Sequence, residues 1–117
     1  MDLNKLRDEI YDDAVAHGLW ESHDYTVQEA LKDAEKDGYY LSFDEANRGW
    51  AMEPIRKEVN ELENAAEFAE DYAEELADVI IMSMSVEGKL GIDIDATVRR
   101  KMDINRKRPW KHEGEKK

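Results

Sequence analysis

Two pairs of acidic residues, each with its members three positions apart, could supply a metal-binding site. Glu58 and Glu61 form the first pair, and Glu75 and Asp78 form the second. On a helix, residues three apart share a face with Cβ atoms roughly 5–6 Å apart, so each pair can direct two carboxylates at one point. Apolar residues at helical spacing flank both pairs, which places the acids at the edge of a buried face. Carboxylates crowded there are costly unless a cation or protons compensate, so the pattern indicates a site for hard cations.

The chain must fold back on itself between the two pairs. A continuous helix would separate Glu61 from Glu75 by about 21 Å at a rise of 1.5 Å per residue, too far to share a metal. Asp71 followed three residues later by Glu74 is typical of a helix N-terminus with a reciprocating glutamate. We therefore expect one helix to end near Ala66 and the next to start at about Tyr72. Packed antiparallel, the two helices would bring the acidic pairs together.

A basic and polar trio near the end of the chain could bind an anionic substrate. Lys101, Asn105 and Arg108 lie at positions i, i+4 and i+7, so they would share one face of a helix and its exit. An ammonium, an amide and a guanidinium suit contacts to a triphosphate and to a base or sugar. The alternative for the trio is a solvated helix face.

Three tryptophans have different expected roles. Trp20 could stack on a nucleotide base, with a core or interface position as the equal alternative. We expect Trp50 and Trp110 to serve in packing.

Local signals predict helices along almost the whole chain. Apolar residues at helical spacing predict a first helix over residues 3–17, ended by Gly18. Capping boxes at residues 26–29 and 42–45 predict the starts of two further helices, and Gly38 predicts the end of the first of these. We expect helical structure to break at Gly49 and Pro54. Pro54 would then lie in the first turn of the helix that carries Glu58.

The end of the chain follows the same rules. Gly88 and Gly91 predict the end of the second acidic helix. Asp93 predicts the cap of a last helix, which Pro109 ends by biasing Arg108 away from helical geometry. No segment alternates with period two for long enough to form a strand. The sequence therefore predicts an all-α antiparallel bundle of about five helices.

Length and composition limit the class of protein to which this chain can belong. The 117 residues suit one domain, which we place at residues 1–112, with a disordered basic tail at 113–117. Such a small core is helped by oligomerisation, so we expect a homodimer or homotetramer. The chain has no cysteine, no apolar run of membrane-spanning length and no signal-peptide pattern at its start. These features favour a soluble, cytoplasmic protein that does not enter a membrane.

Charge is divided unequally between the body and the end of the chain. The net charge is −12, yet residues 99–117 hold nine Lys and Arg against three acids. The overall charge argues against general binding to nucleic acid. An acidic body with a basic end suits a cation on the body and an anionic substrate held by the end. A solubilising acidic surface with a frayed terminus is the alternative.

These residues together resemble the MazG-like all-α nucleoside triphosphate pyrophosphohydrolases. The resemblance covers roughly residues 54–112. It rests on residues 57–65 (KEVNELENA), 74–80 (EELADVI), 91–93 (GID), 101–105 (KMDIN) and 108–112 (RPWKH). Residues 16–21 are also similar to the aromatic stretch near the start of family members. Residues 24–50 look like extra sequence, and Met82 stands where several relatives carry an aromatic residue.

The resemblance implies a specific activity and site. It implies a helical oligomer that binds Mg²⁺ through Glu58, Glu61, Glu75 and Asp78 and hydrolyses a nucleoside triphosphate between the α and β phosphates. In this scheme Glu58 or Glu61 acts as general base, and Lys101, Asn105, Arg108 and Trp20 contact the substrate. The resemblance gives no preference for base or sugar.

Two other hypotheses stay open from the sequence. One is a non-catalytic acidic helical protein, either a DNA mimic or a partner-binding bundle, which would spread its acids over the surface and need no clustered basic trio. The other is a different pyrophosphatase of the same fold, such as one acting on phosphoribosyl-ATP.

Overall fold

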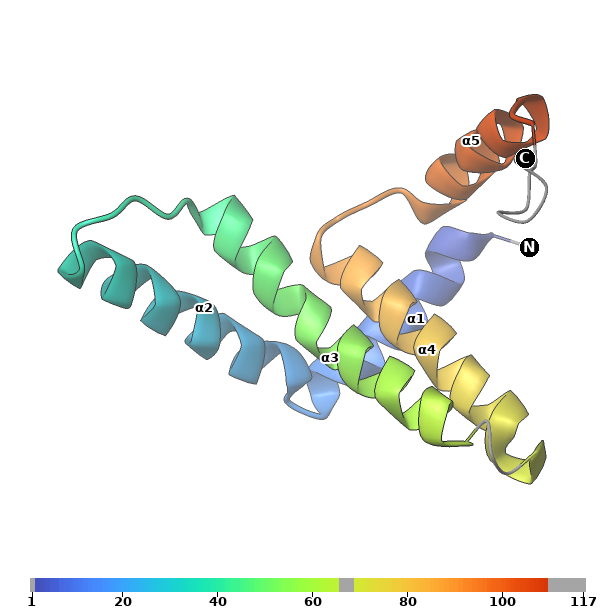
Figure 1. The fold of residues 1–117 in the computed structure, drawn as a ribbon, viewed down its shortest axis with the longest axis horizontal. Helices are drawn as coiled ribbons and strands as arrows, with labels where there is room; N and C mark the ends of the chain where they lie inside the picture. Colours follow the sequence, from blue (N-terminus) through green and yellow to red (C-terminus); the bar gives the residue numbers. More distant parts are fainter. Residues whose placement is uncertain (1, 66–68, 110–117) are drawn as a thin grey trace, which may run out of the picture.

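The computed structural model describes residues 2–65 and 69–109, and in this part of the chain it is entirely helical (Figure 1). No strand occurs among the described residues, which confirms the all-α prediction. The five helices are α1 (Leu3–Ala16), α2 (Leu19–Lys36), α3 (Phe43–Ala65), α4 (Ala69–Lys89) and α5 (Ile94–Lys107).

Antiparallel hairpins organise the molecule. Helices α2 and α3 form one hairpin, and α3 and α4 form a second one that brings the two acidic segments side by side (Figure 1). Helix α1 packs across α4, and α5 packs on α1. None of the described helices is long and apolar enough to cross a bilayer.

The core lies where α2, α3 and α4 meet. Trp20, Ala51 and Val86 form its buried cluster, and Tyr11 of α1 packs against it. The Trp20 indole Nε1 donates a hydrogen bond to Ser85 Oγ at 3.0 Å, which satisfies a polar group that would be costly to bury alone. The helices are therefore held together mainly by their small and aromatic side chains at this junction.

Several helix boundaries follow the predicted local chemistry. Gly18 adopts φ +83° between α1 and α2, a left-handed conformation that glycine reaches without a Cβ penalty. Ser42 Oγ accepts a hydrogen bond from the Glu45 backbone N–H at 3.1 Å and opens α3. Asp93 Oδ1 accepts one from the Ala96 backbone N–H at 3.0 Å and opens α5. Arg108 leaves the helical region at φ −91° and ψ 135°, as the following proline requires.

The predicted helix start at Thr26 is wrong. Helix α2 begins at Leu19 and continues through Thr26. Trp20, His23 and Val27 recur at helical spacing and are all buried, so burial extends the helix across the capping signal. The Thr26 hydroxyl instead donates to the Ser22 carbonyl at 3.1 Å, a bond that threonine makes inside helices.

The predicted breaks at Gly49 and Pro54 are also wrong, because α3 runs from Phe43 to Ala65 without interruption. Ala46 and Ala51 are buried on its inner side and keep this stretch packed against its neighbours. Packing there outweighs the loss of one helical hydrogen bond at the proline, which typically costs about 3 kcal/mol in an isolated helix.

The turn between the two acidic helices lies earlier than the sequence predicts. Helix α3 ends at Ala65 and α4 already begins at Ala69, so Asp71 lies within α4 and is not its cap. The predicted disordered tail at residues 113–117 and Trp110 lie outside the described residues.

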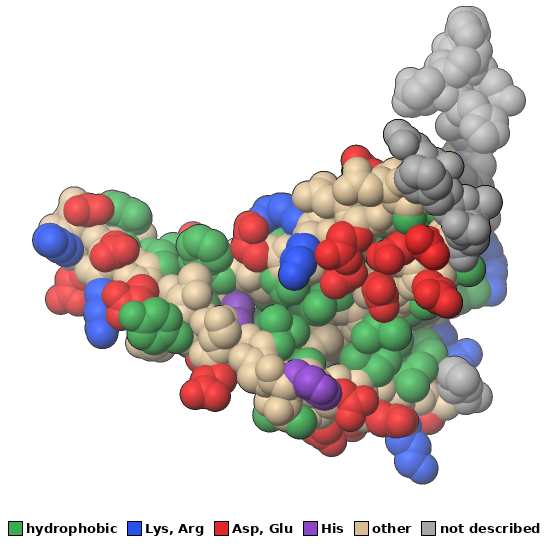
Figure 2. All heavy atoms as spheres, turned by 90° about the horizontal axis from the view of Figure 1, so that it is seen from below, with side chains coloured by type: hydrophobic (Ala, Val, Ile, Leu, Met, Phe, Trp, Pro, Cys, Tyr) green, Lys and Arg blue, Asp and Glu red, His purple; other side chains and the backbone are tan. Residues whose placement is uncertain are grey.

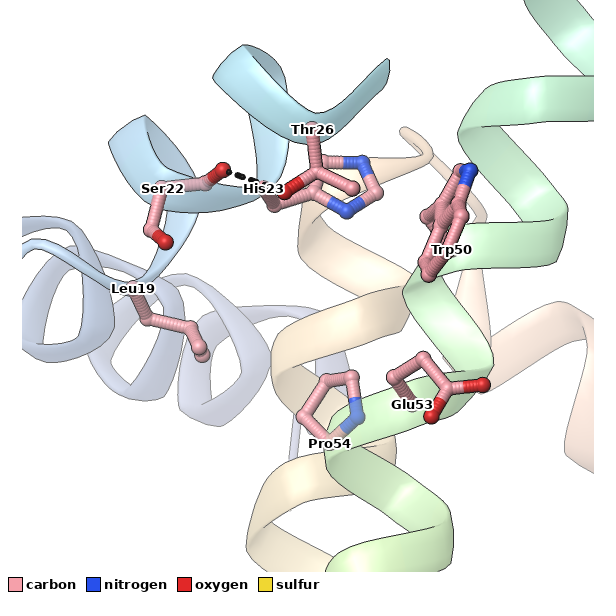
Figure 3. A pocket seen from close by; sticks show the side chains of 7 residues that line it. All are labelled: Leu19, Ser22, His23, Thr26, Trp50, Glu53 and Pro54. Atoms are coloured by element: carbon pink, nitrogen blue, oxygen red, sulfur yellow. Dashed lines mark hydrogen bonds between the residues drawn. The ribbon is translucent and has the colours of Figure 1, made fainter. Parts of the chain in front are cut away.

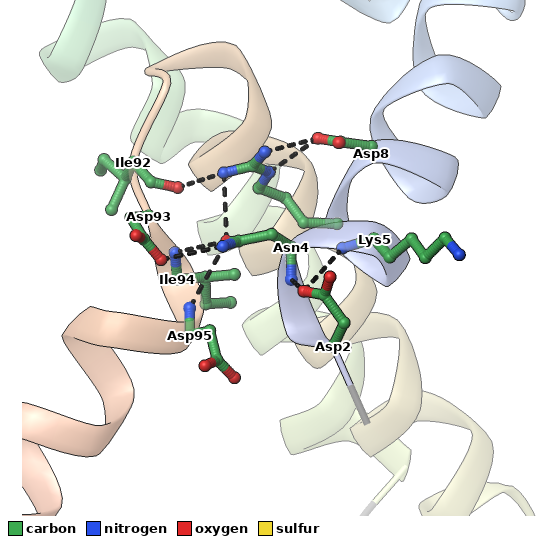
Figure 4. A network of polar contacts seen from close by, with 9 residues as sticks. Asp2, Asn4, Lys5, Asp8, Ile92, Asp93, Ile94 and Asp95 are labelled. Carbon is green, nitrogen blue, oxygen red and sulfur yellow. Dashed lines mark hydrogen bonds and ion pairs between the residues drawn. The ribbon is translucent and has the colours of Figure 1, made fainter.

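A polar network ties the start of α1 to the start of α5 (Figure 4). The Asn4 side-chain oxygen accepts a hydrogen bond from the Ile94 backbone N–H at 2.9 Å, and its amide nitrogen donates to Asp93 Oδ1 at 2.9 Å. Arg7 donates to the Ile92 carbonyl next to them. Asn4 therefore acts as a cap for a helix that lies 90 positions further along the chain.

Helices α1 and α4 approach closely at Gly88, and this gives a testable difference between two helical glycines. A Cβ at Gly88 would lie 2.7 Å from Tyr11 Cβ, whereas a Cβ at Gly49 would meet nothing within 4 Å. Gly88→Ala should destabilise the fold, because overpacking costs about 1–3 kcal/mol and exceeds the roughly 1 kcal/mol that alanine gains in a helix. Gly49→Ala should stabilise the fold by about 0.5–1 kcal/mol. Urea unfolding of both variants checks the prediction, and two shifts of the same sign would contradict it.

Candidate metal centre

The α3–α4 hairpin brings together carboxylates from both acidic pairs. Carboxylate oxygens of Glu58, Glu75 and Asp78 all lie within 4.8 Å of one another. Glu61 is a neighbour of this group, since it contributes to the raised pKa of Glu58. The hairpin therefore brings three of the four predicted ligands together, and the role of all four as metal ligands stays a prediction. We refer to these four residues as the acidic cluster.

The acidic cluster sits at the border between the core and the surface. Glu58 and Glu75 are half-buried, and Glu61 and Asp78 are exposed. On the face drawn in Figure 2, Asp and Glu side chains gather in a patch that hydrophobic side chains border. Within the acidic cluster, two carboxylates are thus partly withdrawn from water and two remain open to it.

Two oxygens of the acidic cluster lack a partner. Glu58 Oε2 and Glu75 Oε2 are buried and accept no hydrogen bond from the described residues. None of the ion pairs between described residues involves the acidic cluster. Buried polar atoms are almost always satisfied in folded proteins, so these two oxygens call for a compensating group.

Burial, and after it the charge of neighbouring acids, raises the pKa of the two half-buried glutamates. Burial is the largest cause for Glu58, followed by a hydrogen bond with Glu61 and by the charges of Glu61, Asp78 and Glu75. Burial is also the largest cause of the raised pKa of Glu75, followed by the charges of Asp78 and Glu61. Both groups would hold protons more strongly than a free glutamate when no cation is present.

These shifts predict a pH-dependent stability of the metal-free protein. A carboxyl group whose pKa is raised on folding binds protons better in the folded chain, so the free energy of unfolding increases as pH falls from neutral toward the ordinary value of 4.5. Glu58→Gln removes this group and should stabilise the metal-free protein at pH 7.5 more than at pH 5.5. Thermal unfolding in EDTA at both pH values measures the difference. A difference between variant and wild type that is the same at both values would contradict the prediction.

The basic trio lies on another helix. Lys101 and Asn105 belong to α5, and Arg108 follows its last turn. The most extensive packing of α5 is with α1 and not with the α3–α4 hairpin (Figure 1). The expected convergence of the trio on the acidic pairs therefore stays a prediction.

The structure places Trp20 in the core. Its side chain is 2% exposed, with Tyr11 and His23 as aromatic neighbours. This position matches the packing alternative, because a ring so buried has no open face for a base. Trp50 shows the reverse, since it is 41% exposed and lines a pocket instead of being buried in packing.

Two polar groups near this pocket were not singled out by the sequence. His23 is buried, and its Nε2 lies 2.7 Å from Asn47 Oδ1 of α3. The contact joins residues 24 positions apart on two helices, so no spacing within either helix could have revealed it.

Comparisons with known proteins add no relative: no family model, no curated protein and no solved structure matches this chain.

Proposed function

We propose that this chain is a divalent-cation-dependent nucleotide pyrophosphohydrolase that cleaves a nucleoside or deoxynucleoside triphosphate between the α and β phosphates. The products are a nucleoside monophosphate and pyrophosphate. One observation carries the proposal: the hairpin places three carboxylates within 4.8 Å of one another. Two of them have a buried oxygen that accepts no hydrogen bond within the described part of the chain. The resemblance of the acidic and basic segments to MazG-like enzymes supports the reaction class.

The donor set suits Mg²⁺. All of its atoms are carboxylate oxygens, the ligands that this hard cation prefers. The three oxygens lie within 4.8 Å of one another, close enough for a single cation to be held between them. Glu58, Glu75 and Asp78 would hold the cation, with Glu61 beside them.

The residues of the cluster also suit the chemistry of the attacking water. A bound divalent cation would offset the charge of the triphosphate and polarise the α-phosphoryl group. Glu58 or Glu61 would accept a proton from the water as its oxygen bonds to the α-phosphorus and pyrophosphate leaves.

The basic trio would hold the substrate in this scheme. Lys101 and Arg108 are exposed and carry the charges that suit phosphate oxygens. Asn105 lies between them on α5 and is half-buried. Nucleotide substrates of this kind are abundant in the cytoplasm, where we place the protein.

Exposed apolar side chains on α4 support the proposal that the enzyme is a homodimer or homotetramer. Leu76, Ile80 and Ile81 are 41%, 55% and 47% exposed. Contiguous exposed apolar side chains often mark a protein–protein interface. Light scattering should give a mass of two or four chains, whereas a stable monomer of 13.6 kDa that turns over nucleotide would contradict this.

A substrate screen tests the proposed function. The common NTPs and dNTPs are incubated with the protein, with Mg²⁺ or with EDTA, and released pyrophosphate is measured. We expect pyrophosphate from at least one nucleotide with Mg²⁺ and none with EDTA. No Mg²⁺-dependent release from any of them would favour the non-catalytic alternatives, a DNA mimic or a partner-binding bundle.

A further inference from the structure

A pocket of about 240 Å³ lies between α2 and α3, outside the acidic cluster (Figure 3). Leu19, His23 and Thr26 line it from α2, and Trp50, Glu53 and Pro54 face them from α3. Small-molecule sites typically occupy about 300–1,000 Å³, so this pocket is sized for one ring system and not for a whole nucleotide.

The pocket combines a rigid wall with an available aromatic ring. His23 is 7% exposed and is fixed by its contact with Asn47. The edge of His23 also packs against Trp20, with ring centroids 5.0 Å apart at an interplanar angle of 79°. Trp50 is the largest side chain that lines the pocket, and it keeps 41% of its surface exposed. A planar ligand could therefore stack on Trp50 without disturbing the core.

The pocket and the acidic cluster are adjacent along α3. Pro54 lines the pocket and Glu58 belongs to the cluster, and residues four apart lie on one side of a helix with a rise of about 6 Å. Both side chains are half-buried. One extended ligand could thus place a ring in the pocket and a charged group at the cluster.

We propose that this pocket binds the base of the nucleotide, with Trp50 stacking on it and Glu53 selecting bases that carry an amino group. The inference rests on the proposed function and adds a substrate class to it. An ionised carboxylate only accepts hydrogen bonds, so Glu53 pairs with the exocyclic amine of cytosine, adenine or guanine. Uracil and thymine carry no exocyclic amine, and a carboxylate repels the two carbonyl oxygens that flank their N3–H.

The present partner of Glu53 does not block this role. Glu53 forms an ion pair with Arg56 one turn along α3, and the two side chains are 54% and 59% exposed. Exposed pairs of this kind are weak because water screens them. A carboxylate has two oxygens, so one can bind Arg56 while the other accepts from a base.

A binding experiment tests the stacking role without requiring turnover. The probes are the Mg²⁺ complexes of a dCTP analogue with a methylene group between the α and β phosphates, and of inorganic tripolyphosphate. Stacking on an aromatic side chain typically changes affinity by about tenfold or more. Trp50→Ala should therefore weaken the binding of the dCTP analogue by about that factor. Its affinity for tripolyphosphate should stay unchanged. Trp50→Phe should retain most of the affinity for the analogue, and Met52→Ala serves as an exposed control on α3 outside the pocket.

A specificity measurement tests Glu53. Wild type should favour dCTP over dUTP in kcat/KM, and Glu53→Gln should reduce this ratio by about tenfold, because glutamine both donates and accepts. Equal binding of the analogue by wild type and Trp50→Ala, or an unchanged ratio in Glu53→Gln, would overturn the inference while leaving the proposed function intact. If wild type hydrolyses no nucleotide, the proposed function fails. In that case Trp50-dependent binding of the analogue would still support the base site.

Discussion

Replacing Glu75 with glutamine should abolish nucleotide hydrolysis without unfolding the protein, and Glu61→Gln should do the same. Glu75 belongs to the group of three carboxylates within 4.8 Å of one another. Loss of an outer partner of a metal site typically lowers activity by about 10–100-fold, so loss of a direct ligand should lower kcat/KM by at least about a hundredfold. The measurement is Mg²⁺-dependent pyrophosphate release by purified variants.

Stability separates this effect from misfolding. Glutamine removes one charge from a crowded set in which burial and neighbouring acids already raise the pKa of Glu75. The metal-free variants should therefore unfold at the same temperature as wild type or at a higher one. Glu63→Gln, an exposed change on α3, the helix that carries Glu61, is the matched control and should keep full activity. If both Glu61→Gln and Glu75→Gln release pyrophosphate as fast as wild type, the metal-site hypothesis is wrong.

Replacing Lys101 or Arg108 with alanine should weaken catalysis while leaving metal binding intact. Charge-assisted hydrogen bonds to phosphate contribute roughly 1.5–3 kcal/mol, which corresponds to a loss of about ten- to a hundredfold in kcat/KM. Truncation after Trp110 should have a much smaller effect, because it keeps the trio and removes only residues 111–117.

The packing of α5 makes this comparison informative. Within one chain α5 packs mainly on α1, through contacts that include the Asn4 cap, so an alanine at Lys101 or Arg108 should leave the packing of the α3–α4 hairpin unchanged. If both alanine variants retain full activity while the truncation is inactive, the phosphates are held elsewhere and the trio is a solvated helix face.

Local chemistry was enough to predict the fold class and several helix ends. Gly18, Ser42 and Asp93 each mark a boundary through a bond or a backbone conformation that involves residues close in sequence. The acidic pairs were predictable for the same reason, since the spacing within each pair fixes a shared helix face and only one fold-back was needed to join them. The four acids are the part of the candidate site that the sequence located best.

The features that the sequence missed depend on contacts between distant segments. Thr26 and Pro54 carry signals of helix starts, yet burial of their neighbours keeps both inside longer helices. The contact of His23 with Asn47 arises only when α2 folds against α3, and the cap that Asn4 gives to α5 joins opposite ends of the chain. The burial of Trp20 and the exposure of Trp50 have the same origin, because composition cannot tell which of two helical tryptophans faces the junction of three helices.

The fate of the α–β phosphate bond tests the central hypothesis most directly. A nucleotide found active in the screen is incubated with the protein and Mg²⁺ in water enriched in ¹⁸O, and the products are followed by ³¹P NMR. We predict a nucleoside monophosphate that carries the ¹⁸O label, together with unlabelled pyrophosphate, and we predict that Glu75→Gln yields neither. A nucleoside diphosphate with inorganic phosphate, label in the pyrophosphate, or the same products from Glu75→Gln would contradict the assignment of the acidic cluster to α–β cleavage.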